Sequence, residues 1–206
     1  MGILRDVFYR SPNPLAYLTS LGYVFNLSEV ALATAVTGPT TFATTTPSFI
    51  VNNAAASGMT VIPLYFSFQQ SGTVAGGAVT ITMEVDNAAR YSSGGTAVTA
   101  QNAWVNGGIN NSALPSGVTA FSGSGGAITA TNAAGVRIWS PLVGQDVSSA
   151  EGVTNELVWT PPTGAPELLT ATSVLGASWL VHAVAAVTGV TFLWAAKVAV
   201  IPNSEL

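Results

Sequence analysis

The clearest pattern along the chain is a strict alternation of apolar and polar residues in segment 79–86. One side of this extended segment carries only apolar side chains: Val79, Ile81, Met83 and Val85. The other side carries only polar ones: Thr80, Thr82, Glu84 and Asp86. Such alternation is typical of a half-buried strand in an antiparallel sheet. We therefore expect Glu84 and Asp86 on a solvated strand face.

An earlier segment, 60–68, also has the pattern of a strand. In a regular strand its large apolar side chains share one face: Ile62, Leu64, Phe66 and Phe68. Pro63 lies within it and has no N–H to donate to a neighbouring strand. The segment is therefore expected at a sheet edge or with a bulge.

The most apolar stretch, 178–201, is about long enough for a membrane helix. Thr188-Gly189 supplies a turn in its middle, and His182 and Lys197 interrupt it. Two antiparallel strands, 178–187 and 190–201, explain these residues better, so we expect no membrane contact. Both faces of the second strand are largely apolar, which predicts a central strand or one covered by a neighbouring subunit. The candidate interface residues here are Trp179, Phe192, Trp194 and Val198.

Many short strand-like segments, often 8–12 residues apart, are separated by Gly, Pro, Ser and Asn. Besides those above they are 16–25, 29–36, 49–52, 97–105, 118–121, 127–131, 135–139, 157–160 and 168–173. This spacing predicts an all-β sandwich or barrel, and we expect an antiparallel, jelly-roll-like sandwich. Residues 1–14 are expected to form an extended N-terminal arm. Residues 15–206 would form one β-sandwich domain, with 87–134 as a loop-rich excursion of long Gly/Ser/Asn-rich loops.

The chain is unusually poor in charge, because only 7% of its 206 residues are Asp, Glu, Lys or Arg. A typical soluble domain has about 25%. The five basic residues are scattered and the net charge is −4, which argues against nucleic-acid binding. Arg5 and Arg10 in the arm are kept as candidates for contact with an acidic neighbour. With no cysteine, disulfides and thiolate metal sites are excluded.

Candidate catalytic chemistry is sparse. His182 is the single histidine, and no acidic residue lies near it in sequence, so it is interpreted as a hydrogen-bonded structural residue. Glu84 and Asp86 share a strand face but are too few to hold a cation without further ligands. No setting typical of two glycosidase carboxylates is recognisable. We therefore expect no catalytic, metal or cofactor-binding residue, and a protein that is not an enzyme.

Several features together resemble virion structural proteins of phages. They are the arm with Pro12 and Pro14, the Thr/Ala/Val/Gly-rich strands, the scarcity of charge, and an apolar last strand that ends near Leu206. The resemblance implies a jelly-roll-like capsid, capsid-decoration or minor capsid protein in the virion. It would assemble as a homo-oligomer, often a trimer, with other capsid proteins as partners. The long charged helix of the tailed-phage major capsid fold is missing, which favours a decoration or minor capsid role.

Two other hypotheses stay open. A receptor- or carbohydrate-binding module of a tail spike or fibre would expose Trp or Tyr in a groove, perhaps among loops 87–134. A glycan depolymerase would need two facing carboxylates in a cleft.

Overall fold

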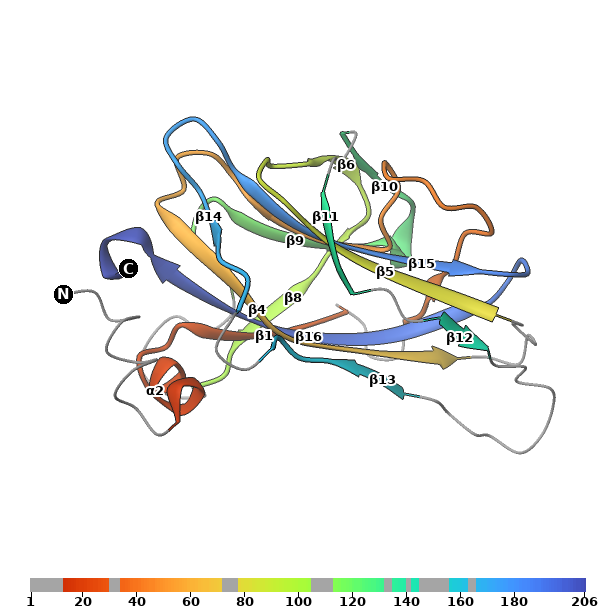
Figure 1. Ribbon diagram of the computed structural model, residues 1–206, viewed down its shortest axis with the longest axis horizontal. Helices are drawn as coiled ribbons and strands as arrows, with labels where there is room; N and C mark the ends of the chain where they lie inside the picture. The colour runs from red at the N-terminus through yellow and green to blue at the C-terminus, as the bar shows by residue number, and fades with distance from the viewer. Residues whose placement is uncertain are drawn as a thin grey trace.

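Two antiparallel β-sheets pack face to face in the computed structural model of the chain (Figure 1). The structure describes residues 13–29, 34–71, 78–104, 113–131, 135–139, 142–144, 156–162 and 166–206. The protein is thus mostly β, with its sheets packed as a sandwich, as the sequence predicts. The predicted arm lies almost wholly outside the described residues, and Arg5 and Arg10 lie there too.

The five main strands of sheet A follow one another across the lower layer of Figure 1. In spatial order they are β13 (Glu156–Trp159), β4 (Met59–Ser71), β16 (Thr191–Pro202), β1 (Val24–Ser28) and β8 (Thr99–Asn102). The short β14 (Leu169–Thr170) pairs with β4, and β2 (Val36–Thr37) pairs with β16.

Sheet B forms the upper layer. In spatial order its strands are β11 (Val136–Trp139), β5 (Ala78–Asp86), β15 (Ala177–Ala185), β3 (Phe49–Asn53), β9 (Val118–Ser122) and β7 (Thr96–Ala97). The short β12 (Leu142–Gly144) also pairs with β5. Two 3₁₀ turns, η1 (Gly123–Gly125) and η2 (Asn203–Glu205), follow β9 and β16.

Aromatic rings fill the space between the two sheets. Phe49 and Trp179 come from sheet B, and Phe66 and Trp194 come from sheet A. The ring centroids of Phe49 and Trp194 are 4.5 Å apart, and those of Phe66 and Trp179 are 5.8 Å apart in an edge-on arrangement. Both distances suit favourable aromatic pairs. The cluster therefore joins the layers at their centre.

Strand β16 is central, as its two apolar faces predict, because it pairs with β1 on one side and β4 on the other. Its face carrying Phe192, Trp194 and Val198 belongs to the main core. On the opposite face, Ala199 and Ile201 are buried in a second, smaller cluster.

The expected bulge in β4 is present, and it corrects one prediction about this strand. Lys197 pairs with Tyr65 but the next residue, Val198, pairs with Pro63, so Leu64 is an extra residue. An extra residue reverses which side chains face inward. Phe66 and Phe68 therefore lie in the main core, whereas Ile62 and Leu64 belong to the second cluster. These four side chains do not share one face.

The prediction of a strand over 16–25 is wrong for its first half, where the chain forms α2 (Pro14–Ser20). Asn13 caps this helix, since its side-chain oxygen accepts a hydrogen bond from the Ala16 N–H at 3.1 Å. Pro14 occupies the first turn, where a missing N–H costs nothing. Leu18 then packs against the outer side of sheet A in the second cluster. None of the described helices is long and apolar enough to span a bilayer.

The middle segment 87–134 contributes more to the sandwich than a loop-rich excursion would. Strands β7, β8 and β9 from this segment extend the two main sheets. Only β6 (Tyr91–Gly94) and β10 (Ile128–Ala130) form a separate pair. This pair covers the outer side of sheet B, where Ile128 and Ala130 pack with Ile50 and Leu180.

The packing predicts that Trp179→Ala destabilises the protein by about 4 kcal/mol, because it removes a fully buried ring from the centre of the core. Urea unfolding followed by circular dichroism measures this free energy. Trp104→Ala is the matched control, since Trp104 is 41% exposed, and it should cost less than about 1 kcal/mol. Equal losses for the two variants would contradict the arrangement.

Candidate interaction surface

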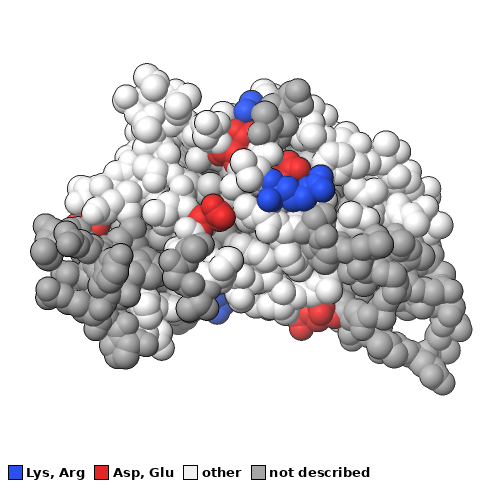
Figure 2. All heavy atoms as spheres, in the orientation of Figure 1, with Lys and Arg blue, Asp and Glu red and all other residues white. Residues whose placement is uncertain are grey.

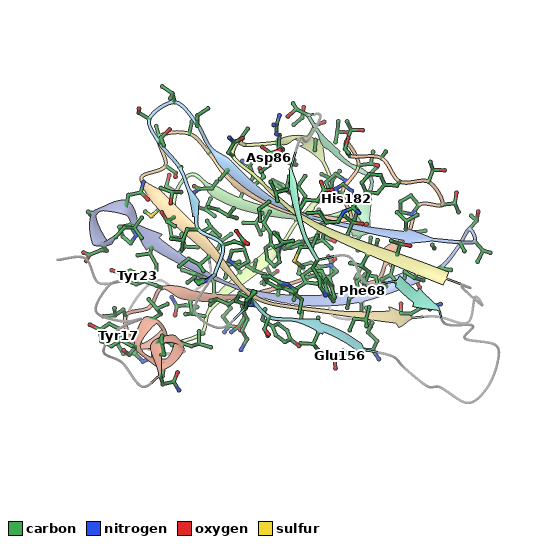
Figure 3. The ribbon with its side chains drawn as sticks, in the orientation of Figure 1. Tyr17, Tyr23, Phe68, Asp86, Glu156 and His182 are labelled. Carbon is green, nitrogen blue, oxygen red and sulfur yellow. The ribbon has the colours of Figure 1, made fainter. Side chains whose placement is uncertain are left out.

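The outer face of sheet B is largely covered. The β6–β10 pair lies over β3 and β15. Beside it, the ring of Phe42 lies on His182, with ring centroids 5.0 Å apart. Figure 3 shows His182 in the upper layer and Phe68 between the layers. This face therefore leaves little open sheet for a partner.

A charged cluster lies on this covered face, and it corrects the expectation for Glu84 and Asp86. Glu84 and Asp86 are only 6% and 5% exposed. These two residues on the polar side of β5 are therefore buried and not solvated. Arg90 pairs with Asp86 at 3.0 Å. Arg137 on β11 lies opposite Glu84 in the strand register. In Figure 2, red and blue atoms gather in the upper middle, and most of the other described surface is white.

His182 is buried beside this cluster, with Nε2 4.0 Å from a carboxylate oxygen of Glu84. The sequence separates these residues, whereas pairing of β5 with β15 brings them together. Burial lowers the pKa of His182 to about 4, and the nearby backbone of Thr46 offsets only part of that shift. Burial raises the pKa of the Glu84 carboxyl, while Arg137 opposes this shift and Asp86 adds to it. At neutral pH His182 is therefore uncharged. Its two ring nitrogens are buried without a well-formed hydrogen bond to any described residue, so the predicted hydrogen-bonded role is not borne out.

The outer face of sheet A is more open. Its polar residues are Asn26, Ser28, Tyr65, Ser67, Gln69, Thr99, Gln101, Glu156 and Lys197, and its apolar residues are Val158, Leu193 and Ala195. Helix α2 covers one end of the sheet, next to these residues. We call this set the open face. Uncharged hydroxyl, amide and small apolar groups dominate it.

Two charges lie on the open face among the described residues of its strands. Lys197 projects from β16 and Glu156 from β13. The Tyr65 hydroxyl donates a hydrogen bond of 3.4 Å to Glu156. Figure 3 places Glu156 at the lower edge of the molecule, away from His182. Apart from these two charges, the face has the composition of a surface that can be covered without burying ions.

A buried carboxylate that sequence reasoning missed ties the two sheets together. Glu29 follows β1 and is 7% exposed. It accepts hydrogen bonds from the Trp194 Nε1–H at 2.6 Å, from the Ser124 hydroxyl at 2.8 Å and from the Ser122 hydroxyl. Trp194 belongs to sheet A, whereas Ser122 ends β9 of sheet B. The only signal in the sequence is an isolated acid after an apolar strand, because its partners lie far along the chain.

A second polar tie lies at the other end of β3. Asn53 is 1% exposed, and its side-chain amide donates hydrogen bonds of 2.9 Å to the carbonyls of Met59 and Leu169. Those carbonyls belong to strands of sheet A, whereas β3 belongs to sheet B. Both ties satisfy buried polar groups, which would otherwise cost stability.

Two surface pockets differ in chemistry. One, of about 460 Å³, lies between segments 36–48 and 123–128, and none of the described residues that line it is charged. The other, of about 370 Å³, is lined by Asp86 and Glu167 together with Val136 and Leu168. Asp86 is already paired with Arg90 there. Within the described part of the chain, no three His, Asp or Glu side chains cluster closely enough to hold a metal ion.

The candidate interface residues from the last two strands lie inside the subunit. Trp179, Phe192 and Val198 are 0% exposed, and Trp194 is 9% exposed. They belong to the main core between the sheets, so they present almost no surface to a neighbouring chain. The open face lies on the opposite side of β16, at Leu193, Ala195 and Lys197.

The geometry thus defines a β-sandwich with one covered sheet face and one open, charge-poor face. No protein-family model matches the sequence, and comparisons with curated proteins and with solved structures gave no match.

Burial of neutral His182 predicts that the protein loses stability as the pH falls from about 6.5 to about 4. The unfolded chain binds a proton on this histidine in that window and the folded chain does not. The loss amounts to about 3 kcal/mol. Glu84 acts in the opposite direction, since its raised pKa favours the folded state at low pH.

His182→Gln removes the titrating group and should flatten this pH dependence. Urea unfolding at pH 7 and pH 4.5 measures the difference between the two proteins. The same slope in wild type and variant would show that His182 does not control acid stability.

The hydrogen bonds to Glu29 predict that Glu29→Ala costs about 3 kcal/mol. The substitution leaves two hydroxyls without their acceptor and the buried Trp194 N–H with only its 3.3 Å hydrogen bond to the Ser122 hydroxyl. Thermal or urea unfolding measures the loss. Glu156→Ala removes an exposed carboxylate and should change stability by less than about 0.5 kcal/mol. A small effect at Glu29 would mean that this tie does not hold the sheets.

Proposed function

We propose that this protein is a non-enzymatic virion structural protein with a jelly-roll sandwich, acting by packing against other subunits. It would be a decoration, minor capsid or capsid subunit and would form a homo-oligomer, a trimer in the simplest case. Its other partners would be capsid proteins of the same particle. The order of strand pairing is the observation that carries this proposal.

Eight strands pair in a nested series, the first with the last and so on inward. The four pairs are β1 with β16, β3 with β15, β4 with β13, and β5 with β11. Two further pairings, β4 with β16 and β5 with β15, complete the sheets. Nested pairing is expected of one long antiparallel hairpin rolled into two sheets. A jelly roll is built in this way and is common in viral capsid and lectin domains.

The segment between β5 and β11 fits the same scheme as an insertion. Its strands β8 and β9 add to the outer edges of the sheets, beside β1 and β3. The insertion therefore widens both sheets without disturbing the nested pairs.

The charge-poor surface supports subunit packing. A surface of Ser, Thr, Asn and Gln can be covered by a neighbour without the desolvation cost of buried ions. The open face has this composition and is a sheet surface suited to face-to-face packing.

Carbohydrate or receptor binding by a tail spike or fibre is the second candidate, and one observation favours it. Trp104, within the 87–134 segment, is 41% exposed, as a sugar-stacking platform requires. Lectin domains also use jelly rolls. Specific glycan-array binding that Trp104→Ala abolishes would support this function, and no binding would leave the virion role preferred.

The proposed function predicts that the purified protein is oligomeric at micromolar concentration and that its peptides occur in intact particles. Analytical ultracentrifugation measures the first, and mass spectrometry of gradient-purified virions measures the second. A stable monomer that is also missing from particles would overturn the proposal.

A further inference from the structure

We propose that the open face of sheet A packs against the same face of a second copy of this chain, across a two-fold axis. This inference rests on the proposed oligomeric function and names the surface that serves it. It is separate from the contact that makes a trimer, because a closed shell built of trimers also needs contacts that join them in pairs.

The two charges of the open face lie too far apart to pair within one chain. Lys197 is opposite Tyr65, and Glu156 is opposite Gln69, four residues further along β4. Strand β4 also separates the two strands that carry these charges. At about 3.3 Å per residue and about 4.8 Å per strand, their backbones are about 16 Å apart.

A two-fold axis solves this arrangement. When the axis lies in the interface and crosses the midpoint of the line from Lys197 to Glu156 at a right angle, rotation places each lysine opposite the glutamate of the other copy. The face then carries one positive and one negative position that exchange under the symmetry, so it is complementary to itself. Two ion pairs form, and no charge of the face is left unpaired.

The residues at the centre of the proposed contact are uncharged. Ser67 lies midway between the two charges, since it is two residues from both Tyr65 and Gln69 on β4. Its neighbours across the strands are Ala195 and Val158. Ser67 itself is 8% exposed, and the Tyr65 and Glu156 side chains, joined by a hydrogen bond, flank it along β4. A second copy would therefore pack on these two side chains.

Charge balance favours a second copy over a different partner. An acidic or basic partner would leave one of the two charges facing its own sign, which is costly at an interface. Beside the face, Leu15 and Tyr17 on α2 are 45% and 41% exposed and provide apolar area at its rim. In a second copy of the same face, each charge would lie opposite a charge of the other sign, and the apolar rim would add buried area.

Charge reversal tests the contact. Lys197→Glu and Glu156→Lys, made singly, should each weaken the pairwise step at least about tenfold, because each places like charges opposite each other twice. An equal mixture of the two single variants should associate again, and so should the double variant. Glu167→Lys, a reversal in the pocket near β14 and off this face, is the control and should leave association unchanged.

Sedimentation equilibrium gives the dissociation constants, and circular dichroism with thermal unfolding confirms that every variant is folded. If the protein oligomerises but the single reversals leave the dissociation constants unchanged, the proposed face is wrong and the proposed function stands. If the single variants are weakened but their mixture does not associate, the two-fold pairing is overturned. A wild-type protein that is monomeric at high concentration would overturn the two-fold pairing, and the proposed function would fall with it only if the protein is also missing from intact particles.

Discussion

The contact of four aromatic rings between the sheets is the interaction on which the rest of the structure depends. Phe49 and Trp179 from one sheet meet Phe66 and Trp194 from the other, with centroids 4.5–6.3 Å apart. The chain has few charges to organise it, so burial of these large side chains supplies the main force that joins the layers. Glu29 accepts a hydrogen bond from the Trp194 Nε1–H, whereas the Trp179 Nε1–H is buried without a hydrogen-bond partner in the described part of the chain.

The few charged residues of the protein are unevenly distributed over the two sheets. Glu84, Asp86, Arg90 and Arg137 gather on the covered side of sheet B, where opposite signs lie near one another. The open face of sheet A carries one positive residue, Lys197, and one negative residue, Glu156, on opposite sides of Ser67. A protein that works by packing needs this division, since charge left on a contact surface must be paired or desolvated at a cost.

Much of the fold could be predicted from periodicity, whereas the surfaces could not. Segment 79–85 alternates as predicted, with Val79, Ile81 and Met83 in the core. Pro63 predicted either an edge strand or a bulge, and the bulge is present, but the face reversal that follows from Leu64 required the register of the partner strand. Asn13 and Pro14 carried a helix-start signal, and strand propensity in the following residues obscured it.

The sequence by itself determined the strand class, the two-sided apolar character of the last strand and the low charge of the chain, because these depend on local periodicity and composition. Only the tertiary structure decided which apolar face of that strand is internal, so Phe192 and Trp194 are core residues and Lys197 marks the open face. It alone also brought Glu29 to Trp194 and Glu84 to His182. Both contacts join residues about 100 or more positions apart, and no local pattern records which strands will become neighbours.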